Sequence, residues 1–285
     1  MANLIFSHLQ KLLVCTDGSP ASEGAVNAGV ELGILTDAKI CLLEVINTPL
    51  GYEPISVIPQ LLSALEEQAR NRLRKYQEGA AATGVTLEGA VRTSMSVPDS
   101  ILEEAGDRKP DWIIVGRKGL SGIESLLIGS VASRVIGSSP CHVLVMPREA
   151  KLRFKKILIG HDGSVFGEGA WRQTIMLAEK ANSEVIAVSV ARDESRKLAL
   201  QMVLQHLKAS AARHKIRLEP LLLEGRPFEQ IIQVAQDEKV DLIVLGSHGR
   251  SGLARLLMGS VVERVIGTVK CPVLVTKLQE AEVTI

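Results

Sequence analysis

The chain carries one glycine pattern twice. Gly116 and Gly119 are followed after nine residues by Gly129 and Ser130, and Gly246 and Gly249 are followed after nine residues by Gly259 and Ser260. A lone glycine serves many kinds of turn, but two copies with identical internal spacing indicate a duplicated site. The chain is therefore expected to fold as two similar units.

The duplication extends beyond the glycines. Residues 11–19 match residues 156–164, and both segments end in Asp-Gly-Ser. Asp17 and Asp162 lie 145 positions apart while Gly116 and Gly246 lie 130 apart, so the first half holds 15 extra residues between these points. Most of them fall in the proline-rich segment 47–62, which cannot be one regular element. A length of 285 residues suits two domains, predicted at residues 1–149 and 150–285.

Short apolar runs alternate with longer amphipathic segments in each half. Strands are expected at 11–16, 39–46, 86–92, 111–115 and 141–146, and at 156–160, 184–190, 217–223, 241–245 and 271–276. Helices are expected at 21–35, 58–82, 98–108 and 131–136, with counterparts in the second half. Near-continuous Val, Ile and Leu runs suit parallel strands covered on both faces. The alternation predicts an α/β fold of two tandem doubly wound domains.

The last strand of each half, 141–146 or 271–276, is apolar and ends its domain. An exposed apolar edge invites aggregation, so it should be paired or covered. We expect these two strands to join the halves as an intrachain pseudo-dimer with approximate twofold symmetry. A homodimer of the whole chain stays open as a further arrangement.

Composition excludes several classes of protein. The net charge is +1 and aromatic residues make up 3% of the chain, which argues against nucleic-acid binding. Cys15, Cys41, Cys141 and Cys271 form no C-x-x-C pair, so reduced thiols are expected. No apolar run approaches the roughly 20 residues of a membrane span. We expect a cytoplasmic protein.

Ligands of open parallel sheets bind beyond the carboxyl ends of the strands. Asp17 and Asp162 follow the first strand of each half. Ser19 followed by Pro20 predicts a helix with Ser19 as N-cap, which would leave the Asp17 carboxylate for a ligand. A turn aspartate that bonds its own backbone is the alternative. The recurrence of Asp17 as Asp162 in the second half favours the ligand role.

The glycine pattern predicts an anion site. Gly116 and Gly246 are expected to end the fourth strands, with backbone N–H groups near Gly119 and Gly249 turned toward one centre. Gly129-Ser130 and Gly259-Ser260 precede helices predicted to begin at Val131 and Val261, whose N-termini favour phosphate. Ser260 is also expected to cap its helix, in a capping box with Glu263. The chain has no P-loop motif, and no G-x-G-x-x-G follows its first strand.

These residues resemble the ATP-binding branch of the universal stress protein family, and the whole chain resembles a tandem member. The resemblance implies five-stranded parallel sheets of order 3-2-1-4-5 with helices on both faces. It implies ATP, with Mg²⁺, as the ligand. In the first half the implied contacts are Asp17, Val45, Gly116, Arg117, Gly119, Gly129, Ser130 and Val131. In the second half they are Asp162, Val190, Gly246, Gly249, Arg250, Gly259, Ser260 and Val261. Val45 and Val190 would line the adenine pocket.

The two halves depart unequally from the family pattern. Gly246 to Arg250 match its usual form, whereas Arg117 and Lys118 replace a common Ser-His pair. Arg117 or Lys118 either supplies charge to phosphates or faces solvent, and the segment 47–62 could cover the first site. Both sites are expected to bind, the second more securely.

Three functions fit the sequence. The first is a stress-response binding module in which ATP occupancy biases a conformational equilibrium. The second is a slow ATP hydrolase, for which Asp17, Asp162 and His248 are the candidate residues. The third is a nucleotide α-hydrolase-like or electron-transfer-flavoprotein-like domain, although nothing marks a substrate pocket or a flavin partner. Binding without substantial catalysis is the favoured function.

Overall fold

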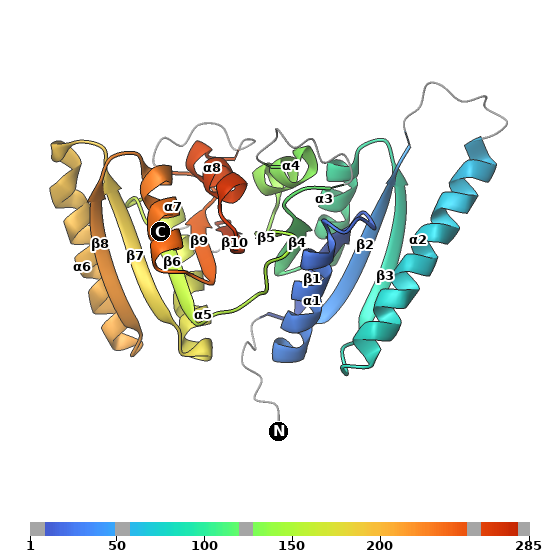
Figure 1. Ribbon diagram of the computed structural model, residues 1–285, viewed down its shortest axis with the longest axis horizontal. Coiled ribbons are helices and arrows are strands. Elements are labelled where there is room, and N and C mark those ends of the chain that lie inside the picture. The colour runs from blue at the N-terminus through green and yellow to red at the C-terminus, as the bar shows by residue number, and fades with distance from the viewer. Residues whose placement is uncertain (1–8, 49–57, 120–127, 250–257, 279–285) are drawn as a thin grey trace.

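The computed structural model describes residues 9–48, 58–119, 128–249 and 258–278. The first half comprises β1 Lys11–Thr16, α1 Glu23–Thr36, β2 Lys39–Asn47, α2 Ile58–Ala81, β3 Leu87–Ser94, α3 Val97–Arg108, β4 Trp112–Gly116, α4 Ser130–Ser138 and β5 His142–Met146. The second comprises β6 Lys156–Gly160, α5 Val165–Ala181, β7 Glu184–Ala191, the 3₁₀ turn η1 Glu194–Arg196, α6 Lys197–Arg213, β8 Arg217–Glu224, α7 Pro227–Asp237, β9 Leu242–Gly246, α8 Ser260–Thr268 and β10 Val273–Thr276. The element order is repeated (Figure 1).

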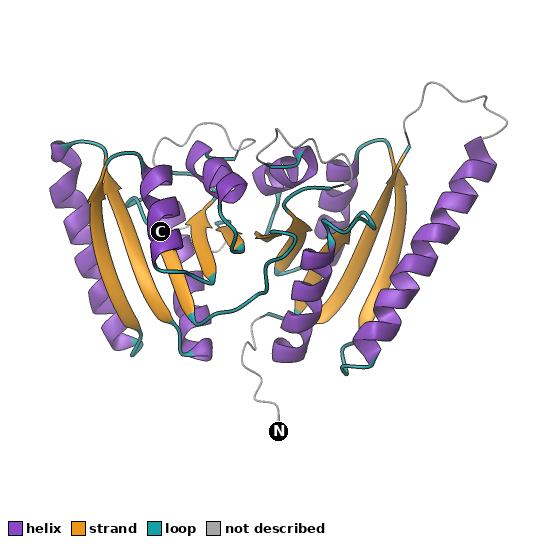
Figure 2. Ribbon diagram, in the orientation of Figure 1, coloured by secondary structure: helices purple, strands orange, loops and turns teal. Residues whose placement is uncertain are grey.

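The strands form one ten-stranded sheet in the order β3-β2-β1-β4-β5-β10-β9-β6-β7-β8. Each half follows the predicted order 3-2-1-4-5, and every pairing within a half is parallel. Helices cover both faces (Figure 2). The helices α1, α2, α5 and α6 contribute to one apolar core, and α3, α4, α7 and α8 contribute to the other. The predicted tandem doubly wound fold is confirmed.

The two halves meet at β5 and β10, the only antiparallel pair in the part of the sheet that the structure describes. Leu144 lies opposite Leu274, and both are fully buried. Both leucines belong to one core cluster that runs through the two halves. The prediction that the terminal strands join the halves is therefore confirmed, and the apolar edge is covered by its own counterpart.

Two predicted helix caps are wrong. The helix α1 begins at Glu23 with Ser22 as N-cap, because the Ser19 hydroxyl donates to Asp17 Oδ1 over 2.5 Å instead of turning toward the helix. A turn closed by Ser22 N and Ser19 O precedes the helix. At α8 the N-cap is Gly259, and Ser260 is already the first helical residue, so the capping box with Glu263 does not form.

Lys277 follows β10 and predicts a measurable pH dependence. Burial lowers the pKa of Lys277 to about 8. Between that value and the ordinary lysine pKa near 10.4 the unfolded chain holds a proton that the folded chain has lost, so stability rises with pH. Relative to Lys277→Met, the free energy of unfolding of the wild type should increase by about 1–3 kcal/mol from pH 7 to pH 10. Urea titrations at both values measure it, and parallel pH profiles for the two chains would contradict it.

Candidate functional site

Each half has a cavity at the carboxyl ends of its strands, with a volume of about 460 Å³ in the first half and about 360 Å³ in the second. The first is lined by every predicted residue of its half: Asp17, Val45, Gly116, Arg117, Gly119, Gly129, Ser130 and Val131. The second is lined by Asp162, Val190, Gly246, Gly249, Gly259, Ser260 and Val261. Arg250 lies outside the described residues, as does most of the segment 47–62.

The same backbone bonds hold both glycine loops. In the first half Arg117 N donates to Met146 O over 2.9 Å, and Gly129 N donates to Arg117 O over 2.9 Å. In the second, Ser247 N donates to Thr276 O over 3.0 Å, and Gly259 N donates to Ser247 O over 3.1 Å. The residue after the fourth strand of each half therefore connects the fifth strand to the start of the next helix.

The helices α4 and α8 begin at these loops. Each has a glycine as N-cap, Gly129 or Gly259, and no side chain caps it. The first-turn N–H groups of a helix lack partners within the helix and carry partial positive charge. Ser130 and Ser260 open the two helices and line the two cavities, one residue earlier than the predicted starts. Each cavity thus has one end whose chemistry suits an anion.

The strand-one aspartates shape the opposite wall of each cavity. Asp17 Oδ1 accepts from Ser19 N over 3.0 Å, and Asp162 Oδ1 accepts from Ser164 N over 3.0 Å. The turn-aspartate interpretation is therefore correct, although it leaves the second carboxylate oxygen facing the glycine loop. A Cβ on Gly119 would lie 2.6 Å from Asp17 Oδ2, and one on Gly249 would lie 2.8 Å from Asp162 Oδ2. Close approach to a carboxylate explains both glycines.

The first cavity contains an ion pair, with a buried carboxylate and a partly exposed arginine, that sequence reasoning missed. Glu44 near the end of β2 is 3% exposed, and Arg72 of α2 donates to both of its carboxylate oxygens. The hydrogen bond to Glu44 raises the pKa of Arg72. Arg72 also covers Gly18, where a Cβ would lie 2.7 Å from its Nε. The cation at this wall is therefore already paired with a carboxylate.

Arg117 adopts neither of the roles predicted for it. Its Nη1 donates to Val269 O over 2.9 Å and to Ile266 O over 3.4 Å, both at the end of α8 in the other half. The guanidinium therefore contacts the other half, while Arg117 also lines the first cavity.

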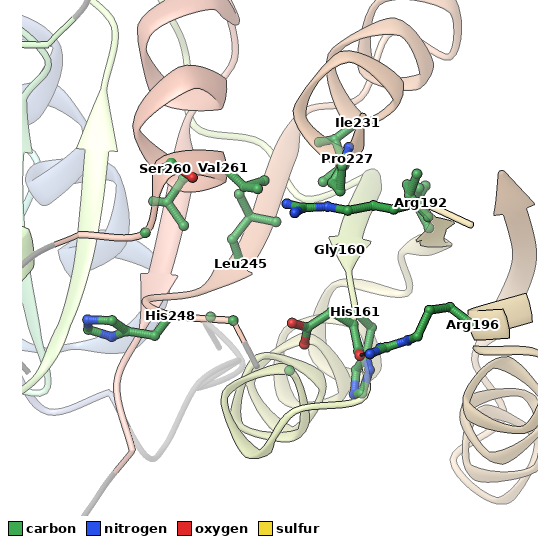
Figure 3. Close-up of a pocket in the computed structure, with 18 of the residues that line it drawn as sticks. Gly160, His161, Arg192, Arg196, Pro227, Ile231, Leu245, His248, Ser260 and Val261 are labelled. Atoms are coloured by element: carbon green, nitrogen blue, oxygen red, sulfur yellow. Dashed lines mark hydrogen bonds between the residues drawn. The ribbon is translucent and has the colours of Figure 1, made fainter. Parts of the chain in front are cut away.

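The second cavity contains two arginines, Arg192 and Arg196, which reach into it from the segment after β7 (Figure 3). Arg196 Nη2 donates to Asp162 O over 3.4 Å, while its buried Nε has no hydrogen-bond partner among the described residues. Comparing the two halves gave no signal for these arginines. With the offset of 145 positions Arg192 corresponds to Asn47 (192 − 145 = 47), after which the first half continues into its insertion.

Two histidines line the second cavity, and both make contacts with neighbouring side chains or backbone. His161 Nδ1 accepts from Gly163 N over 3.1 Å, and its Nε2 lies 3.3 Å from Glu168 Oε1. The bond to His161 lowers the pKa of Glu168. His248 Nδ1 lies 3.1 Å from Ser247 Oγ, and its ring lies 5.2 Å from that of Phe166. The imidazole of His248 points away from Arg192 and Arg196 (Figure 3).

Neither a metal cluster nor a membrane helix is found in the described ranges. They contain no group of three histidine, cysteine, aspartate or glutamate side chains that could hold a metal ion. No helix within them combines the length and apolar character needed to cross a membrane.

The fold and the paired cavities define a tandem, doubly wound α/β protein, and comparison with known proteins gives its family. Residues 8–147 and 153–277 each match the model of the Universal stress protein family, so the chain belongs to that family.

Individual proteins similar to this chain belong to the same family. A universal stress protein of Methanocaldococcus jannaschii is 34% identical over 151 residues, 47% of this chain and 89% of that protein. One of Mycolicibacterium smegmatis is 24% identical over 288 residues, 93% of this chain and 96% of that protein. The crystal structure of a universal stress protein from Archaeoglobus fulgidus has the same fold, with a TM-score of 0.79 at 21% identity over 97% of this chain and 99% of that one.

Proposed function

We propose that the chain binds ATP in its second cavity, and more weakly in its first, and acts as a nucleotide-dependent regulatory module in a stress response. The observation that carries the proposal is the opposition of a helix N-terminus to two arginines across one cavity. The α8 N-terminus with Ser260 lies on one side, and Arg192 and Arg196 lie on the other. Both features favour a polyphosphate.

The remaining lining suits a nucleoside. Val190, Ile231 and Leu245 supply apolar surface for a base, and Asp162 Oδ2 is a hydrogen-bond acceptor beside it. Gly246, Gly249, Gly259 and Val261 complete the proposed contacts, with Arg250 following the loop. Mg²⁺ would enter bound to the phosphates of the nucleotide.

The two proposed sites differ in the positive charge that they offer to a ligand. In the first cavity the Arg72 cation is paired with Glu44, and the Arg117 guanidinium contacts the other half. In the second cavity, which Arg192 also lines, the buried Arg196 Nε has no hydrogen-bond partner among the described residues. A triphosphate should therefore bind the second cavity more tightly.

Binding is favoured over hydrolysis. A hydrolase needs a group that positions or deprotonates water near the γ-phosphate. Of the candidates, Asp162 Oδ1 accepts a backbone N–H, and the His248 ring points away from the arginines. A signal that depends on occupancy needs only a difference in ATP affinity between two conformations. The cytoplasmic location, the homodimer and the domain limits at residues 149 and 150 stay predictions.

Arg196→Met is expected to weaken ATP binding by roughly ten- to a hundredfold, because a charge-assisted bond to phosphate contributes about 1.5–3 kcal/mol. Calorimetric titration with MgATP measures the affinity. Arg217→Met is the control. Arg217 is the first residue of β8, at the end of the strand away from the cavity, and it pairs with Glu184 over 3.0 Å. Equal affinities in Arg196→Met and the wild type would contradict the proposed site.

Two assays accompany the titration. Heat release of small molecules from the purified chain, followed by mass spectrometry, should yield adenine nucleotides; flavin would instead favour the electron-transfer-flavoprotein alternative. Labelled ATP incubated with Mg²⁺ should stay intact over hours. Turnover in the wild type that is abolished by Gly249→Asp would establish the hydrolase alternative.

A further inference from the structure

We propose that Arg117 and Lys277 are positioning residues that couple the two nucleotide sites. Arg117 of the first half holds α8, and Lys277 of the second half holds α4; each of these helices begins at the proposed phosphate site of its own half. The coupling rests on the proposed function, whereas the two contacts themselves do not. Figure 1 shows α4 and α8 side by side where the halves meet.

The first contact runs from site one to site two. Arg117 belongs to the glycine loop of the first cavity, where its carbonyl accepts from Gly129 N. Its guanidinium donates to Ile266 O and Val269 O at the end of α8. The other end of α8 opens the second cavity at Ser260. A cation here satisfies carbonyls that the helix cannot, and complements the helix dipole.

The second contact runs in the opposite direction. Lys277 follows Thr276, whose carbonyl accepts from Ser247 N in the glycine loop of the second half. Lys277 Nζ donates to Gly137 O, near the end of α4, over 3.0 Å. Its backbone N donates to His142 Nδ1 over 3.0 Å, which fixes where the side chain starts. The helix α4 opens the first cavity at Ser130.

The two contacts are not copies of one repeated residue. With the offset of 130 positions, Arg117 corresponds to Ser247 and Lys277 corresponds to Pro147 (117 + 130 = 247; 277 − 130 = 147). Each half therefore supplies its cation from a different position in the repeat. Each cation nevertheless reaches the carboxyl end of the corresponding helix in the other half, α8 or α4. Duplication alone does not produce this reciprocity.

The two contacts provide a route by which a change at one nucleotide site alters the other. A nine-residue helix is short, so a shift at its phosphate-binding end moves its carboxyl end as well. ATP that reorders the first loop moves Arg117 and hence α8, and ATP at the second site acts on α4 through Lys277. Coupling of this kind is reciprocal in affinity.

The contacts are tested first without nucleotide. Arg117→Met should speed amide hydrogen exchange at the end of α8, near residues 267–269, at least threefold and leave α4 unchanged. Lys277→Met should do the reverse near residues 137–139. Arg134→Met is the control, because Arg134 is an exposed cation of α4 whose partner Asp99 lies in the same half, 3.3 Å away. Unchanged exchange in both variants would overturn the proposal.

The effect of each contact on the other half's site is then measured with one site disabled at a time. In a Gly119→Asp background, which disables the first site, Arg117→Met should weaken MgATP binding to the second site three- to tenfold. Arg117→Lys should restore part of the loss because it keeps a cation. In a Gly249→Asp background, Lys277→Met should weaken the first site similarly. Affinities unchanged by both substitutions would overturn the coupling. A wild-type chain that binds no ATP would contradict the proposed function, and the exchange experiment would still decide whether the contacts position the helices.

Discussion

Gly249→Asp is expected to lower the ATP affinity of the second cavity by roughly a hundredfold or more, equivalent to about 2.7 kcal/mol. The new Cβ would lie 2.8 Å from Asp162 Oδ2, closer than real Cβ contacts allow. The new carboxylate would also stand beside that of Asp162 and face the proposed phosphates, and both encounters are repulsive. Calorimetric titration with MgATP should lose its tighter phase and keep the weaker one.

Two further substitutions separate the causes. Gly249→Ala introduces the contact without the charge and should weaken binding less. Gly106→Asp adds the same carboxylate to α3 at a glycine whose Cβ would meet nothing within 4 Å, and should leave both phases unchanged. Gly119→Asp is the counterpart for the first site, where the Cβ would lie 2.6 Å from Asp17 Oδ2. A tighter phase that survives Gly249→Asp would place it outside the second cavity.

Most of the fold could be predicted because it depends on local and repeated signals. Buried strands such as Trp112–Gly116 and Leu242–Gly246 are continuous apolar runs, and the second copy corroborates the first. The strand order came from the family resemblance. The pairing of β5 with β10 followed from one physical argument, namely that an apolar edge strand must be covered.

The errors arise where two local interactions compete. Ser19 can cap a helix or bond to Asp17, and both options have the same sequence signature. The structure shows the second, so α1 starts at Glu23 after an extra turn. Ser260 lies one residue beyond the N-cap Gly259, and the sequence pattern does not distinguish these two positions.

The missed contacts and residues involve partners far away in sequence or positions with no repeated counterpart. Arg117 contacts a carbonyl 152 residues away, which no local pattern encodes. Glu44 and Arg72 are 28 residues apart, on opposite sides of the insertion. Arg192 aligns with Asn47, and Arg196 falls where the first half continues into its insertion, so comparing the halves gave no signal for either arginine. The arginines that distinguish the second cavity are thus residues that sequence comparison missed.

Leu274→Ala is expected to lower the free energy of unfolding by about 2–5 kcal/mol, because a buried leucine loses both its transfer energy and its packing. Leu274 of β10 is fully buried and lies opposite Leu144 of β5, at the seam between the halves. Urea denaturation followed by circular dichroism measures the change. Leu198→Ala is the matched control: Leu198 is 69% exposed on α6 and should change stability by less than about 0.5 kcal/mol.

Leu144→Ala should cost a similar amount, and the double variant shows whether the seam acts as one core. Leu144 and Leu274 are paired in register within one core cluster, so their effects should not be additive. The expected total is smaller than the sum of the single losses by about 0.5 kcal/mol or more, because the second truncation enlarges a space already opened by the first. Strict additivity, or two separate unfolding transitions in the wild type, would mean that the halves are stabilised independently despite their shared sheet.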